Sequence, residues 1–94
     1  MNLKHRILLL LYKYPHIRLS ELRAWLPDVS NEVIKSELIR LRRLGLIQRN
    51  GKRTQYQYAL SPAGVEYIEN QYLVHRFYEL KLIDNMLFED FNAR

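Results

Sequence analysis

The sequence contains no cysteine, and it has only three prolines and three glycines among 94 residues. The absence of cysteine excludes disulfide bonds, thiolate nucleophiles and cysteine-ligated zinc or iron–sulfur centres. The longest unbroken aliphatic run, residues 7–11, is far shorter than the ~20 residues that cross a bilayer. The first residues also lack a signal-peptide pattern. We therefore expect a cytoplasmic, intracellular protein that makes no membrane contact.

The residue patterns of common enzymes are also missing. The three histidines, His5, His16 and His75, are scattered, and no pair has the i, i+4 spacing of a metal-ligand motif. There is no glycine-rich phosphate loop and no local arrangement of serine, histidine and aspartate. We expect no catalytic residues, no metal site and no cofactor.

Positive charge is concentrated in the first two thirds of the chain. Lysine and arginine exceed aspartate and glutamate by 15 to 10, which gives a formal net charge of +5. Residues 1–61 carry +8, and residues 62–94 carry −3. Basic domains usually meet phosphate backbones, anionic membranes or acidic proteins. The charge favours a basic module over residues 1–61, followed by a segment with another role.

Apolar residues recur with a helical period in three segments that precede residue 45. The expected N-caps of these three helices are Asn2, Ser20 and Ser30. The third helix covers residues 31–44 and ends at Gly45, a residue suited to a left-handed backbone. Only residues 27–30 separate the second and third helices, which is the connection length of a helix-turn-helix.

A β-hairpin and a long helix are expected next. Residues 46–49 and 54–58 are rich in β-forming side chains, and Asn50-Gly51-Lys52-Arg53 joins them. An Asn-Gly pair favours a tight hairpin turn in which both residues have positive φ. Ser61-Pro62 then gives an N-cap followed by proline at the first helical position, opening a helix to Phe91.

Four stretches of this chain carry a resemblance to a known family. Two lie in the helix-turn-helix: Leu19-Ser20-Glu21-Leu22, and Val33-Ile34 with Leu38 and Leu41. Leu44-Gly45-Leu46-Ile47 leads into the hairpin, and Tyr58 to Gly64 leads out of it. They resemble the small winged helix-turn-helix transcriptional regulators of the MarR, PadR and ArsR-like kind, including compact archaeal and archaeal-virus members.

The resemblance implies a mainly α fold with a small β-hairpin, in the α+β class. It would comprise a winged helix-turn-helix DNA-binding module over residues 1–61 and a C-terminal dimerisation helix over residues 62–94. Part of that helix must project, because 30 residues span ~45 Å. Its apolar stripe suits a second copy of the chain, with the alternative that it breaks near residues 79–81 and folds back. The expected dimer-interface residues are Leu73, Phe77, Leu80, Ile83, Leu87 and Phe91.

The third helix is the expected recognition helix. A helical wheel turns Ile34, Leu38 and Leu41 to one side. The opposite, DNA-facing side carries Glu32, Lys35, Ser36, Ile39, Arg40 and Arg43. The resemblance places recognition positions at Lys35, Ser36, Ile39 and Arg40. In a major groove the two cations can address guanine edges or phosphates, and the isoleucine can pack on a thymine methyl. The competing interpretation is a solvated helix face with arginines near its C-terminus.

The hairpin, residues 46–60, is the expected wing. Its tip residues, predicted to contact the DNA backbone or minor groove, are Arg49, Asn50, Lys52 and Arg53. The competing interpretation is that charge protects an edge strand from pairing. Tyr56 and Tyr58 are expected to cover the helices, although their spacing also fits a stacking platform for single-stranded nucleic acid.

The sequence thus predicts a homodimeric, sequence-specific regulator that binds double-stranded DNA and represses transcription. One alternative is a winged-helix protein-interaction or assembly module. Another is an architectural or replication protein that binds DNA with little sequence preference. A small-molecule effector is not indicated.

Overall fold

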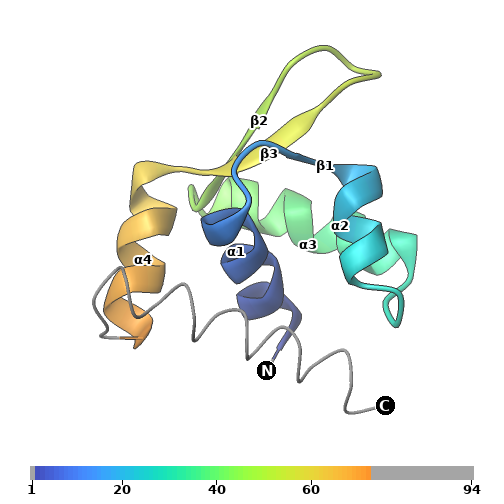
Figure 1. Ribbon diagram of the computed structural model, residues 1–94. Coiled ribbons are helices and arrows are strands. Elements are labelled where there is room, and N and C mark those ends of the chain that lie inside the picture. Colours follow the sequence, from blue (N-terminus) through green and yellow to red (C-terminus); the bar gives the residue numbers. More distant parts are fainter. Residues whose placement is uncertain (1, 73–94) are drawn as a thin grey trace.

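The computed structural model describes residues 2–72 as four helices and one antiparallel sheet (Figure 1). The elements in chain order are α1 (Leu3–Lys13), β1 (Ile17–Arg18), α2 (Leu19–Trp25), α3 (Asn31–Arg43), β2 (Ile47–Asn50), β3 (Gln57–Leu60) and α4 (Pro62–Tyr72). This is an α+β arrangement, as the sequence predicts. The remainder of the expected C-terminal helix, with all six expected dimer-interface residues, lies outside the described residues.

Three of the helices begin as their sequences predict. The side chain of Asn2 accepts a hydrogen bond from the backbone N–H of His5 at 2.9 Å, at the start of α1. The hydroxyls of Ser30 and Ser61 accept in the same way from the N–H three residues later, at 3.3 and 3.0 Å. These bonds satisfy backbone donors that the first helical turn leaves without a partner. At the other end of α3, Gly45 has the expected positive φ of 76°.

The predicted N-cap of α2 is wrong. The helix begins two residues earlier than a cap at Ser20 predicts, at Leu19, so Ser20 lies exposed in its first turn. The reason is that Ile17 and Arg18 form a short strand, and the chain enters the helix directly from it. The carboxylate of Glu21 accepts from the Arg18 backbone N–H at 3.1 Å, which supplies the reciprocal bond of a capping box.

The sheet has three strands in the order β1-β3-β2, one more than the predicted hairpin. Both pairings are antiparallel, with Ile17 opposite Tyr58 and Ile47 opposite Leu60. A two-residue strand carries no alternating pattern, so β1 gives no signal in the sequence. Its presence ties the chain just before α2 directly to the wing.

The predicted tight turn at Asn50-Gly51 is also wrong. Asn50 is the last residue of β2 and pairs with Gln57, so residues 51–56 form the loop and the returning strand starts later than expected. Of these two residues only Gly51 has a positive φ, at 95°, and the space for a side chain there is occupied by the Gln55 backbone. The reversal itself lies further along, where the Gln55 N–H donates to the Lys52 carbonyl at 2.7 Å.

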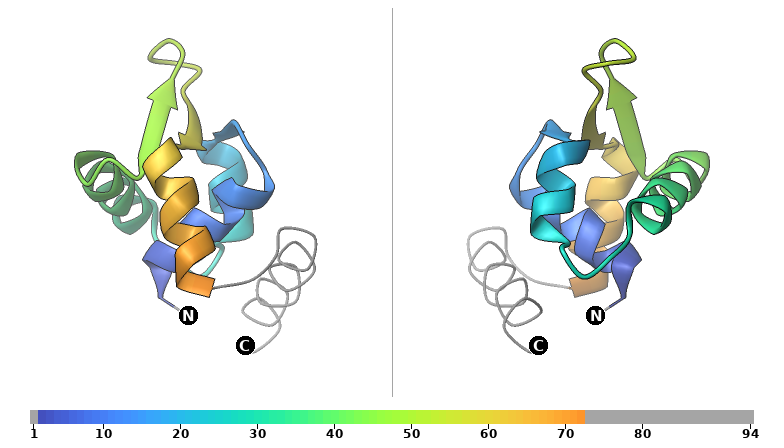
Figure 2. Two further views of the ribbon diagram at one scale, coloured as in Figure 1. Left: turned by 90° about the vertical axis from the view of Figure 1, so that its left-hand side faces the viewer. Right: turned by 90° about the vertical axis from the view of Figure 1, so that its right-hand side faces the viewer.

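The hydrophobic core is built around α1. In Figures 1 and 2 this helix lies between α4 on one side and α2 on the other, while the wing extends away from the helices. The apolar side chains that are almost completely buried come mostly from α1, α2, α3 and α4. From the helices they are Ile7, Leu8, Leu9, Leu10, Leu11, Leu22, Ile34, Leu38, Leu41 and Ile68, and Leu26 after α2 and Ile17 and Ile47 of the sheet join them.

The start of α4 is fastened to the turn between α3 and β2. The Ser61 hydroxyl donates to the Gly45 carbonyl at 2.5 Å, and the Ser61 N–H donates to the Leu46 carbonyl at 3.0 Å. Gly64 lies so close to the Leu46 carbonyl that a Cβ atom would overlap it. The contact requires glycine and brings α4 against the base of the wing.

We predict that Gly64→Ala lowers the free energy of unfolding by about 1–3 kcal/mol, because the backbone of α4 must move away from Leu46. In a thermal melt this corresponds to a fall in Tm of several degrees. Ala63→Ser, at the exposed neighbouring position, is the control and should melt within about 0.5 kcal/mol of the parent. Equal melting of the two variants would contradict the close approach.

Candidate nucleic-acid interface

The polar face of α3 is exposed as the helical wheel predicts. Ile34, Leu38 and Leu41 are at most 2% exposed and pack into the core. All six expected recognition residues, Glu32, Lys35, Ser36, Ile39, Arg40 and Arg43, are exposed. Ile39 keeps 46% of its surface accessible amid these charged and polar neighbours. This helix therefore presents an apolar contact within a basic face.

A hollow of about 250 Å³ lies between α3 and the wing, and we call it the helix–wing hollow. Its apolar wall includes Leu19, Leu38 and Ile39, with Tyr56 and Tyr58 from the wing. Its cations are Lys35 and Arg42 from α3 and Arg49 from β2. No acidic residue of the described chain lines it. The hollow thus combines an apolar floor with a positive rim.

Arg49 is held in place by an aromatic ring. Its guanidinium carbon lies 3.9 Å from the centroid of the Tyr56 ring, which is the geometry of a cation–π contact. Arg49 is paired with Tyr58 across the strands, and Tyr56 lies two residues before Tyr58, in the loop that leads directly into β3. The stacked ring restricts the orientation of this guanidinium.

A second hollow of about 370 Å³ lies between the start of α2 and the wing loop, and we call it the α2–wing hollow. Arg18 and Arg23 line it from one side and Arg53 from the other. No acidic side chain of the described residues lines it. It shares three lining residues with the helix–wing hollow, namely Leu19, Tyr56 and Tyr58.

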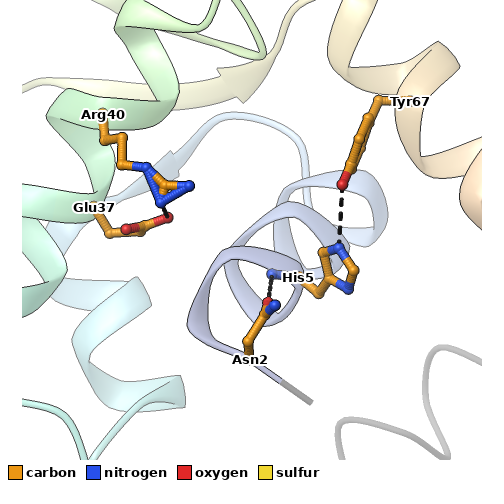
Figure 3. A network of polar contacts seen from close by, with 5 residues as sticks. All are labelled: Asn2, His5, Glu37, Arg40 and Tyr67. Carbon is orange, nitrogen blue, oxygen red and sulfur yellow. Dashed lines mark hydrogen bonds and ion pairs between the residues drawn. The ribbon is translucent and has the colours of Figure 1, made fainter.

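The predicted residues are only partly brought together. Lys35 and Ile39 meet Arg49 at the helix–wing hollow, and Arg53 lines the α2–wing hollow. Arg40 lies on the other flank of α3, where its guanidinium contacts the Glu37 carboxylate at 3.4 Å (Figure 3). The remaining predicted residues are exposed but line neither hollow: Glu32, Ser36, Arg43, Asn50 and Lys52.

The predicted site omits Leu19, Arg42, Tyr56 and Tyr58, which line the helix–wing hollow. Arg42 is one of the arginines near the C-terminus of α3, and it lies one helical turn from Ile39 and two turns from Lys35 on the same side of the wheel. Leu19 appeared only as part of the family resemblance. The sequence predicts that Tyr56 and Tyr58 both cover the helices, yet only Tyr58 is buried, at 7% exposure, while Tyr56 is half-buried beneath Arg49.

An ion pair between a buried arginine and a partly exposed aspartate fixes the turn of the helix-turn-helix. Arg6, in α1, donates through both terminal nitrogens to the carboxylate of Asp28, at 2.9 and 3.2 Å. Arg6 is only 7% exposed, whereas the Asp28 side chain keeps 30% of its surface. The two parallel bonds orient the connection between α2 and α3 relative to the core helix.

We predict that Asp28→Asn lowers the free energy of unfolding by about 1–3 kcal/mol, because the Arg6 guanidinium loses its charged acceptor while remaining buried. Chemical denaturation at neutral pH provides the measurement. Glu32→Gln, an equal charge change at an exposed position, is the control and should change stability by less than about 0.5 kcal/mol. If the two variants have the same stability, the ion pair does not hold the turn.

Polar contacts also join α1 to α4. The His5 Nε2 atom lies 3.3 Å from the Tyr67 hydroxyl (Figure 3), and the Tyr12 hydroxyl donates to the Glu69 carboxylate at 2.9 Å. Burial, with a smaller contribution from the nearby Lys4 ammonium, lowers the pKa of His5. This seam is distant from the two hollows and serves to attach α4 to the core.

Within residues 2–72 there is no helix long and apolar enough to cross a bilayer. The same range also contains no cluster of three or more histidine, aspartate or glutamate side chains arranged to hold a metal ion.

These features define a winged helix-turn-helix domain of the kind found in DNA-binding transcriptional regulators. Its helices α2 and α3 form the helix-turn-helix, α3 is exposed and basic, and the basic hairpin of β2 and β3 projects as the wing. The family model for HxlR-like helix-turn-helix proteins matches residues 3–75. The chain belongs to the HxlR-like helix-turn-helix family, a family of DNA-binding transcriptional regulators that are generally not enzymes. No curated protein matches the sequence.

Proposed function

We propose that the protein is a homodimeric, sequence-specific regulator that binds double-stranded DNA and represses transcription by occluding its site. It would act in the cytoplasm, at the nucleoid. The observation that carries the proposal is the exposed face of α3, where Lys35 and Ile39 stand beside Arg49 of the wing. A basic helix face with an accessible apolar side chain suits a DNA major groove better than it suits solvent.

In this proposal residues 31–44 lie in the major groove. Lys35 and Arg40 donate to guanine edges or phosphates, and Ile39 contacts a thymine methyl. The weak ion pair of Arg40 with Glu37 is exposed and is exchanged for DNA at little cost. The other polar residues on this face contribute hydrogen bonds or phosphate contacts: Glu32, Ser36 and Arg43.

The wing, residues 46–60, lies beside the recognition helix on the backbone and in the minor groove. Its four contact residues are Arg49, Asn50, Lys52 and Arg53. All four are exposed, and three are cationic. Arginine is favoured in a narrow minor groove because the negative potential is strongest there.

We further propose the division at residue 61, with residues 62–94 as the dimerisation segment. The apolar spacing of Leu73, Phe77, Leu80, Ile83, Leu87 and Phe91 in the sequence supports a helical seam. A two-fold dimer would place two recognition helices in successive major grooves, about 34 Å apart. No effector or cofactor is required for this mode of binding.

For the dimer we predict that light scattering at micromolar protein gives twice the 11.4 kDa chain mass. Replacing both Phe77 and Leu80 by aspartate should return the mass to that of one chain, because paired carboxylates oppose burial of the seam. Glu66→Gln, an exposed change in α4, is the control and should leave the dimer intact. A monomer mass for the parent would exclude the homodimer.

The function is tested by fluorescence anisotropy with the duplex upstream of the protein's own gene and with a scrambled duplex, at several salt concentrations. Preference of about 10³-fold or more for one duplex identifies a specific regulator. Equal binding with a steep salt dependence would instead indicate the architectural alternative. Absence of binding to either duplex at low salt would favour the protein-interaction module.

If Ile39 contacts a thymine methyl, we predict that affinity depends on one thymine of the bound DNA site. Replacing that thymine by deoxyuridine should weaken binding of the parent protein by about five- to tenfold, since it removes only the methyl group. Ile39→Ala should bind the two duplexes equally. Val33→Ala, an exposed apolar position on the other flank of α3, is the control and should retain the preference. If no thymine shows this effect, Ile39 does not read a methyl group.

A further inference from the structure

The two hollows meet on either side of the same three side chains. Leu19, Tyr56 and Tyr58 line both, so the helix–wing hollow and the α2–wing hollow are neighbours on the surface. We call the two hollows together the basic channel. Its cations, three from each hollow, are Lys35, Arg42, Arg49, Arg18, Arg23 and Arg53.

With α3 in the major groove and the wing in the minor groove, the part of the DNA that crosses this channel is determined. A recognition helix in the major groove and a wing in the neighbouring minor groove are separated by the sugar–phosphate backbone of one strand. The channel lies between α3 and the wing and continues to the start of α2. A duplex bound in this way therefore runs one backbone over the channel.

We propose that the basic channel holds the sugar–phosphate backbone of one DNA strand, with α2 and the wing loop contacting phosphates beyond the recognition helix. This inference rests on the proposed function and adds Arg18, Arg23 and Arg42 to the interface. Leu19, in the apolar floor, packs against deoxyribose carbons, and the cations on the rim contact the phosphates.

The channel also assigns a role to Tyr56. Its ring supports the Arg49 guanidinium from below, at 3.9 Å, at a point where the ring borders both halves of the channel. A guanidinium that is already oriented loses less side-chain entropy when it binds a phosphate. Tyr56 is thus a positioning residue that acts on DNA through Arg49.

The contribution of α2 is tested with a fluorescein-labelled 30-base-pair duplex of random sequence. The Arg18→Gln/Arg23→Gln double variant is compared with Lys4→Gln/Lys13→Gln, which removes the same charge from α1, outside the channel. Loss of two phosphate contacts should make the slope of log affinity against log salt shallower by about two units. Affinity near ~0.15 M salt should fall at least about tenfold. The control pair should change the slope by less than about half a unit.

Several outcomes separate the inference from the proposed function. If the parent binds the duplex and the arginine pair has the same slope as the lysine pair, the channel is overturned and the proposed function stands. If the parent binds no duplex at low salt, both fail. The Arg18→Lys/Arg23→Lys double variant checks folding and charge together, and it should retain the parental slope.

The role of Tyr56 is tested by two substitutions on the same duplex. Tyr56→Phe keeps the ring beneath Arg49 and should bind within about twofold of the parent, whereas Tyr56→Leu should bind about threefold or more weakly. In an Arg49→Gln background, Tyr56→Leu should add no further loss. A loss that persists without Arg49, or equal losses for the two Tyr56 variants, would show a purely structural role and overturn the positioning assignment.

Discussion

The pairing of β3 with strands on both of its sides is the constraint on which the candidate interface depends. Gln57 pairs with Arg18 in β1 and with Asn50 in β2, and Tyr58 pairs in the same way with Ile17 and Arg49. These paired residues hold β1, which leads into α2, and β2 of the wing on opposite sides of β3. A shift of one residue in β3 would turn Tyr58 out of the core and separate Arg49 from its ring.

This constraint requires a rigid support, which the helices supply. Five consecutive residues of α1, Ile7 to Leu11, are almost fully buried, so this helix is surrounded by the rest of the domain. The Arg6–Asp28 ion pair fixes the turn before α3 relative to α1, and the close contact of Gly64 with Leu46 fixes α4 at the base of the wing. One contact therefore fixes the start of the recognition helix and the other fixes the base of the wing, and both lie outside the DNA-facing surface.

The sequence predicts the parts of this structure that follow from local chemistry. The caps at Asn2, Ser30 and Ser61 and the burial of Ile34, Leu38 and Leu41 are confirmed because hydrogen-bonding groups and periodicity act within a few residues. Features set by distant partners are missed or wrong. The strand β1 exists only because β3 is beside it, and it displaces the expected cap at Ser20.

The candidate interface shows the same division between local and distant effects. The exposed face of α3 is predicted from its own sequence, whereas the grouping of Lys35 and Ile39 with Arg49 depends on the angle between the helix and the wing. The Asn-Gly pair favours a short turn, yet the reversal occurs around Lys52–Gln55, because the ladder continues to Asn50 and Gln57. Nothing in the spacing of Tyr56 and Tyr58 distinguishes the half-buried ring under Arg49 from the buried one.

The distribution of negative charge completes the account of the basic channel. Three carboxylates outside α3 have structural partners: Glu21 bonds the Arg18 backbone, Asp28 bonds Arg6, and Glu69 accepts from Tyr12. On α3, Glu37 contacts Arg40, which does not line the channel. Those acidic groups stabilise the fold instead of neutralising the cations of the channel, so mutual repulsion among the cations is retained in the free protein. A polyanion relieves that repulsion when it binds, and release of its condensed counterions adds to the gain. Repulsion among the cations of the channel thus disfavours the free protein slightly and favours the complex with DNA.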